Sequence, residues 1–202
     1  MSKIDIPESL QFYYESPGNA QAIETLVEKI HGRNDGVTED MSWDDLATYH
    51  RALLAGYQTQ VDLWLFYKAL WEEVWAPATS LLIEAGATDC KAHEYEGELS
   101  LSTTWDECMY RMHNIENGRF ISSVWSDQKA IKIGFHFEEK GGGYGFSNSL
   151  TLDAAAWEHD GNEDEWTTKP VDLPVRGLDH IDVTPLQKAA LAAVRAFTQA
   201  LI

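Results

Sequence analysis

Apolar and polar positions recur with two different periods along the chain, which predicts a helical first half and a strand-rich second half. Residues 19–31 place apolar side chains at helical spacing, and they are followed by Gly32, a residue that commonly ends a helix. We therefore expect a helix over 19–31. The polar segment 32–40 that follows is rich in turn-forming residues, which predicts a loop.

A second, longer helix is predicted to begin at Ser42. Ser42 and Asp45 have the spacing of an N-terminal capping box, and apolar residues then continue at helical spacing. Gly56 is the one candidate for an interruption. Proline lacks a backbone donor and clashes with the preceding turn, so Pro77 should end or kink this helix. A shorter helix should follow and stop at Gly86.

The second half of the chain changes to a period of two, which is typical of half-buried strands. The alternating segments are 97–105, 108–115, 119–126, 130–138 and 144–152. Asn117 and Gly118, between the second and third of these, are the strongest short-range signal for a β-hairpin. Pairing Phe135 with Phe146 would place the apolar residues of the last two segments on one face. These signals predict an antiparallel meander of about five strands.

The end of the chain is predicted to be a loop followed by a helix. Residues 158–183 are rich in acids, prolines and glycines, and we interpret them mainly as an acidic loop region. Thr184 and Pro185 suit the first positions of a helix, and the residues after them carry an apolar stripe at helical spacing. We therefore expect a C-terminal helix over 184–202.

Together these elements predict a single α+β domain over 1–202, in which N-terminal helices pack on an antiparallel β-meander and a C-terminal helix closes the chain. A chain of 202 residues is long enough to bury one core. The expected parts are a mainly helical 1–90, mainly antiparallel strands over 91–157, the acidic loop region 158–183 and the helix 184–202.

Negative charge is spread over the whole chain and restricts the partners that it can bind. The sequence has 33 acidic and 15 basic residues and a formal net charge of −18, with 15 acids against 5 bases in 1–90. A field of that sign repels nucleic-acid phosphates and anionic lipids, and it attracts basic proteins. We expect a basic protein partner, no direct contact with nucleic acid and none with membranes. The alternative interpretation is that the charge keeps a tryptophan-rich protein in solution.

The first residues and the cysteine count favour the cytoplasm. The chain starts without an apolar run behind a basic segment, so no secretory signal is expected. Its two cysteines, Cys90 and Cys108, are too few for a disulfide framework, which is consistent with a reducing compartment.

The aromatic segment 61–75 is predicted to lie in the core. Its three tryptophans, one phenylalanine and one tyrosine are apolar enough to suggest a membrane span, but charged residues interrupt the run well before the ~20 apolar residues that a span requires. A helix that is apolar nearly all round is usually buried at the centre of a fold. The alternative is a surface for a partner or a second copy, because tryptophan and tyrosine are common interface anchors.

Several short patterns are similar to ligand-binding motifs, and each lacks a required part. The glycines of 141–145 lead into a strand instead of a helix, so they do not form a phosphate loop. His136 and Glu138 have the spacing of zinc deaminases, but the chain has no Cys-x-x-Cys segment. The acids of 158–165 lack the glycine and glutamate of a calcium loop, which leaves only weak calcium binding open. The clusters at 106–107 and 179–182 show no sign of burial. We predict no cofactor, no metal ion and no catalytic residue.

The leading hypothesis is an acidic, non-catalytic binding protein that blocks a basic protein surface. An immunity protein or an anti-defence inhibitor would act in this way, with carboxylates in the place of nucleic-acid phosphates. The residues expected to bind the partner are Glu158, Asp160, Glu163, Asp164 and Glu165.

Two other hypotheses stay open. One is a small-molecule-binding protein or an enzyme without a local signature, with a pocket between the aromatic helix and the sheet. Its polar groups would come from His50, Tyr57, His113 or His136. The other is a homodimer that forms through surface aromatic residues.

Overall fold

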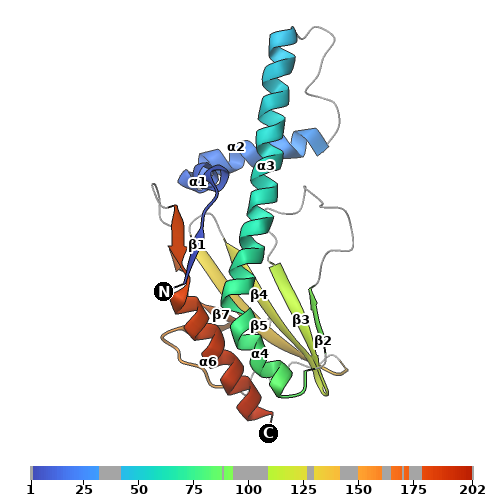
Figure 1. Cartoon of the computed structure of the whole chain (residues 1–202), viewed down its shortest axis with the longest axis vertical. Coiled ribbons are helices and arrows are strands. Elements are labelled where there is room, and N and C mark those ends of the chain that lie inside the picture. The colour runs from blue at the N-terminus through green and yellow to red at the C-terminus, as the bar shows by residue number, and fades with distance from the viewer. Residues whose placement is uncertain are drawn as a thin grey trace.

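Helices cover one face of an antiparallel sheet, which makes the protein α+β as expected (Figure 1). The structure is a computed structural model. It describes residues 2–31, 42–87, 89–92, 109–126, 130–141, 150–160, 165–169, 171–172 and 179–201. The described helices are α1 (Glu8–Glu15), α2 (Pro17–His31), α3 (Trp43–Val74), α4 (Ala76–Glu84) and α6 (Thr184–Ala200).

The long helix begins as predicted and runs without a break. The Ser42 hydroxyl accepts a hydrogen bond from the Asp45 backbone N–H at 3.2 Å, which caps the first turn of α3. Gly56 is buried inside the helix and does not interrupt it. Pro77 lies in the first turn of α4, where a missing N–H costs nothing. Gly86 follows α4 with a φ of 97°, the left-handed conformation that suits glycine just after a helix.

The described strands form two antiparallel sheets. Their bounds are β1 (Lys3–Asp5), β2 (Asp89–Ala92), β3 (Met109–Ile115), β4 (Gly118–Ser126), β5 (Ala130–Glu139), β6 (Trp157–Asp160), β7 (Glu165–Thr168), β8 (Val171–Asp172) and β9 (His180–Asp182). The larger sheet has the order β2-β3-β4-β5-β7-β6, with β8 also paired to β5, and β1 pairs with β9 in a small sheet of its own. The predicted meander is therefore found in β3, β4 and β5, while β2 on one side and the β6–β7 hairpin on the other were not predicted.

One predicted pairing is wrong. Phe135 lies opposite Ser122 of β4 on one side and opposite Trp166 of β7 on the other, so both of its neighbouring positions are taken. It cannot also pair with Phe146, which lies outside the described residues, as does the expected strand over 97–105.

The hairpin of β3 and β4 is where it was predicted, but Gly118 serves a different purpose there. Ile115 pairs with Gly118, so the turn itself is formed by Glu116 and Asn117. Gly118 has no positive φ. A Cβ at this position would lie 2.2 Å from the carbonyl oxygen of Glu138 on β5. Glycine is needed because two strands approach closely, not because the turn requires an unusual backbone conformation.

Aromatic side chains from the helices and from the sheet meet in the core. Trp71 and Trp75 come from the end of α3 and are at most 2% exposed. Phe120 of β4 packs edge-on against Trp75, with ring centroids 6.1 Å apart, and against Phe197 of α6 at 4.9 Å. Phe135 stacks on Phe120 at 5.2 Å. The predicted core role of this aromatic segment is thus confirmed for its last turns, and α6 is buried along the expected stripe.

Candidate functional site

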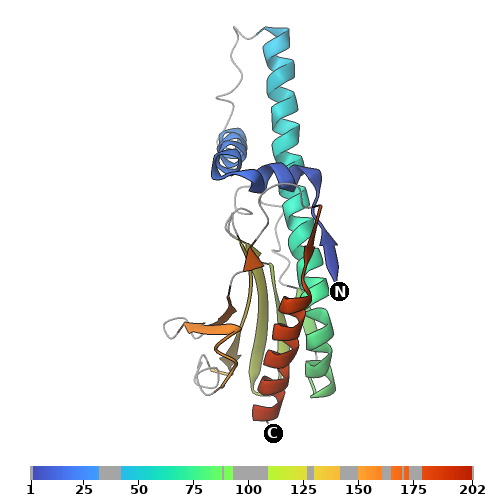
Figure 2. The same cartoon turned by 90° about the vertical axis from the view of Figure 1, so that its left-hand side faces the viewer.

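The acidic segment predicted to bind a partner contains a β-hairpin. Residues 158–183 were expected to be mainly loop, and this is wrong for β6 and β7, which pair antiparallel and attach to β5. The register places Asp160 opposite Glu165 and Glu158 opposite Thr167. Like charges directly opposite each other weaken a strand pair. Figure 2 shows the hairpin on the side of the sheet away from α3.

Aromatic residues anchor this hairpin to the core. Trp157 is 3% exposed, and its ring packs edge-on against Phe135 at 5.4 Å. Trp166 lies opposite Phe135 in the sheet and contacts the ring of His159 at 4.7 Å. The Thr168 hydroxyl accepts a hydrogen bond from the backbone N–H of Ile133 at 3.1 Å. Aromatic and charged residues alternate along β6 because successive side chains point to opposite faces of the sheet: Trp157 is buried on one face, and Glu158 is exposed on the other.

Three of the five predicted partner-binding residues lie on this hairpin. Glu158 is exposed on β6, and Asp160 ends that strand. Glu165 begins β7, is partly buried, and accepts a hydrogen bond from the Ser123 hydroxyl at 3.4 Å. Glu163 and Asp164 lie outside the described residues. Hairpin pairing thus brings the backbones of Asp160 and Glu165 together.

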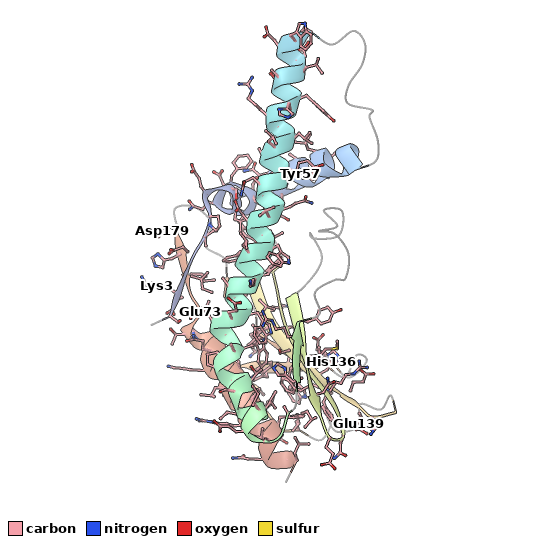
Figure 3. The ribbon with its side chains drawn as sticks, turned by 45° about the vertical axis from the view of Figure 1, so that its right-hand side comes forward. Lys3, Tyr57, Glu73, His136, Glu139 and Asp179 are labelled. Carbon is pink, nitrogen blue, oxygen red and sulfur yellow. The ribbon has the colours of Figure 1, made fainter. Side chains whose placement is uncertain are left out.

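A second polar group joins β1 to β9, far from the hairpin. Lys3 Nζ lies 2.8 Å from His180 Nε2, and His180 Nδ1 lies 2.7 Å from Asp179 Oδ1. A lysine ammonium can only donate, so Nε2 is the acceptor and Nδ1–H donates to Asp179. The hydrogen bond from His180 lowers the pKa of Asp179. Figure 3 shows Lys3 and Asp179 beside each other at the molecular surface.

This group is better suited to hold the chain together than to perform chemistry. The side chains of His180 and Asp179 are 32% and 84% exposed, so water competes for both hydrogen bonds among Lys3, His180 and Asp179. Efficient acid–base catalysis normally requires a group that is shielded from water and has its pKa shifted toward neutral pH. Sequence analysis singled out 179–182 but missed Lys3, because nothing local links residues so far apart.

The third polar group is buried between α3 and the sheet. His113 of β3 is 1% exposed and its ring stacks on Trp71 at 6.2 Å. Burial, followed by the nearby positive charge of Arg111, lowers the pKa of His113 to about 4. The Arg111 guanidinium lies over the Trp71 ring at 4.2 Å and within 3.7 Å of Glu72. Trp71 donates from Nε1 to the Ser122 hydroxyl at 3.0 Å.

The residues proposed for a small-molecule pocket do not converge. His50 and Tyr57 belong to the part of α3 that projects beyond the sheet, and His113 faces the helices. His136 is only partly buried, whereas the residues before and after it on β5 are buried. Figure 3 shows Tyr57 and His136 well apart. Large buried rings fill the helix–sheet interface. A surface cavity of about 330 Å³ does exist, but it lies at the tip of the β3–β4 hairpin beside Arg119 and Glu138.

Glu138, one of the two residues with the spacing of zinc deaminases, has a basic partner in the structure. Glu138 forms an ion pair with Arg119 at 2.6 Å, and His136 is partly buried, which lowers its pKa. Within the described part of the chain, no group of three or more His, Cys, Asp or Glu side chains is arranged to hold a metal ion. Likewise, none of the described helices combines the length and apolarity needed to cross a membrane.

Comparisons with protein-family models, curated proteins and solved structures found no match. A function for this chain can therefore be inferred only from its own charges and contacts.

Proposed function

We propose that this chain is a binding protein that uses the acidic face of the β6–β7 hairpin to occupy a basic patch on another protein. The observation that carries the proposal is the register, which places Asp160 opposite Glu165 in a hairpin anchored by the buried Trp157. Opposed carboxylates weaken a strand pair, and a basic partner would remove that cost by lying across both.

The rest of the molecule supports this proposal in two ways. A formal net charge of −18 speeds encounter with a basic protein at low salt. The hairpin lies on the opposite side of the sheet from α3, so a partner could bind it without disturbing the aromatic core. By occupying a basic surface that would otherwise bind nucleic acid, the protein would act as an inhibitor, in the manner of an immunity or anti-defence protein.

The test compares capture of basic proteins by the native chain and by a neutralised hairpin. The variant carries Glu158→Gln, Asp160→Asn and Glu165→Gln. The matched control removes the same number of charges elsewhere, at the exposed residues Glu8, Glu84 and Glu116, each changed to Gln. The native chain, the hairpin variant and the control variant are each immobilised and exposed to cell lysate at low and high salt. The association rate of any captured protein is then measured.

We expect to capture a protein whose association with the native chain slows steeply as salt is added. The hairpin variant should bind this protein at least tenfold more weakly than the control variant does, since charge pairs at such interfaces contribute about 1.4 kcal/mol or more. Equal binding by the two variants, or an association rate that salt does not change, would refute the assignment to the hairpin.

A further inference from the structure

The outer face of α3 carries exposed apolar side chains at regular intervals. Trp43 is 87% exposed, Leu54 is 54% exposed and Leu65 is 47% exposed, and these are three of the five exposed large hydrophobic residues among those described. Each is eleven residues from the next. Eleven residues make about three helical turns, so the three side chains share one face of the helix. We call Trp43, Leu54 and Leu65 the outer stripe.

The outer stripe lies opposite the face that α3 buries in its own fold. The buried residues Leu63, Phe66, Leu70 and Val74 line the other side of the helix. Figure 2 shows α3 on the opposite side of the sheet from the β6–β7 hairpin, and Figure 1 shows its first turns projecting beyond the sheet. The outer stripe spans about 33 Å, at a rise of 1.5 Å per residue. Single exposed hydrophobic residues are ordinary, but a row of this length on a projecting helix is typical of an interface.

The charges beside the outer stripe indicate which partner it fits. No Asp or Glu occurs from Leu46 to Val61, although the chain has 33 acids, and Arg51 is the one Lys or Arg in that segment. A basic protein would therefore find no carboxylate of α3 along the middle of the outer stripe, since Asp44, Asp45 and Asp62 lie only near its two ends. A second copy of this chain would meet the least self-repulsion there, because the remainder of each molecule is strongly acidic.

The spacing adds a geometric argument for a second copy. Leu54 is equidistant from Trp43 and Leu65 along the helix. When two such helices pack antiparallel about a two-fold axis at Leu54, Leu54 meets its counterpart and Trp43 meets Leu65 of the other copy. Such an interface is isologous, and its eleven-residue period lets two helices stay in contact over the full stripe with a slight right-handed twist. We propose that α3 forms an antiparallel homodimer through the outer stripe.

The dimer should respond to salt in the opposite sense to the proposed hairpin complex. Two chains of charge −18 repel each other, and salt screens that repulsion, so added salt should tighten the dimer while it weakens capture of a basic protein. The two proposals also depend on different residues. Failure of one therefore leaves the other intact.

The first experiment measures the mass of the full chain by sedimentation velocity over a wide range of concentration, at low and high salt. We expect a reversible change from 22.8 kDa to twice that mass, favoured by salt. Leu54→Glu should weaken the dimer roughly a hundredfold, because two buried leucines are lost per dimer. Ala55→Glu is the matched control: it adds the same charge at the next residue, which is exposed but off the stripe, and should weaken the dimer far less.

The second experiment tests the orientation of the helices with cysteine variants under mild oxidation. Leu54→Cys alone should form a disulfide-linked dimer. Trp43→Cys or Leu65→Cys alone should not, whereas a mixture of the two should cross-link, and the native chain controls for Cys90 and Cys108. Cross-linking of every single variant would indicate a parallel pair and overturn the antiparallel model. A monomer at all concentrations and salts, or equal dimerisation of Leu54→Glu and Ala55→Glu, would overturn the dimer through this stripe.

Discussion

The two ends of α3 have similar side chains and opposite environments. Trp71, near the C-terminal end, is 2% exposed, whereas Trp43, at the first residue, is 87% exposed. The difference comes from what faces each residue: β3 and β4 cover Trp71, and the fold places no described residue over most of Trp43. Aromatic content alone therefore does not identify a core. The residues that meet a helix from elsewhere in the chain decide which of its turns are buried.

Replacing Trp71 should have the largest effect on the free energy of unfolding. Trp71→Ala removes a fully packed indole, its hydrogen bond to Ser122 and the stack on His113, so it should lower the free energy of unfolding by about 3 to 5 kcal/mol. Urea denaturation measures this. The control is Trp43→Ala, which should change the same quantity by no more than about 0.5 kcal/mol. If the two substitutions cost the same, the two ends of α3 do not differ as described.

A smaller effect should appear in the pH dependence of stability, through His113. The pKa of His113 is about 4 in the folded protein, below its ordinary value of 6.5, so the unfolded chain takes up a proton first as the pH falls. This lowers stability progressively from about pH 6.5 to about pH 4, by up to about 3 kcal/mol. His113→Phe keeps a ring against Trp71 and should remove this loss.

The measurement for His113 is the free energy of unfolding at pH 7 and at pH 4.5, for the native chain and the variant. His50→Asn, on the exposed part of α3, controls for the removal of one imidazole. The difference between the two pH values should shrink in His113→Phe. An unchanged difference would mean that His113 is protonated with equal ease in both states.

The smallest of these effects concerns a single hydrogen bond. Ser122→Ala leaves the buried Nε1–H of Trp71 without its acceptor, which should lower the free energy of unfolding by about 1 to 3 kcal/mol. Ser123→Ala is the comparison, because the neighbouring Trp75 donates to the backbone carbonyl of Ser123 and keeps that bond. Chemical denaturation should rank Ser122→Ala as the more harmful of the two. The reverse order would contradict the role given to the Ser122 hydroxyl.

Local signals predicted the elements whose causes are local. The capping residue Ser42, the early proline of α6 and the alternation of β5 all act within a few residues, and all three elements were found where expected. Helix α1 was not predicted, because its eight residues are too short to show a clear period.

The remainder depended on contacts between distant segments. Residues 158–168 have turn-forming and acidic residues typical of a loop, and only the packing of Trp157 and Trp166 near Phe135 makes them a hairpin. The position of β7 between β5 and β6 follows from that packing, and a period-two pattern contains no information about strand order. For the same reason, acidic residues of the candidate site could be predicted from the sequence, but the pairing of Asp160 with Glu165 could not.

The small sheet of β1 and β9 has a consequence for how the chain is made. Ile4 pairs with Ile181, and the backbone N–H of Val183 donates to the carbonyl oxygen of Ser2 at 3.1 Å. During synthesis the ribosome releases Ile4 long before its partner exists, and contacts of such large sequence separation form late. Strand β1 is thus among the last elements to be paired, because it has no partner until the residues leading into α6 have been translated.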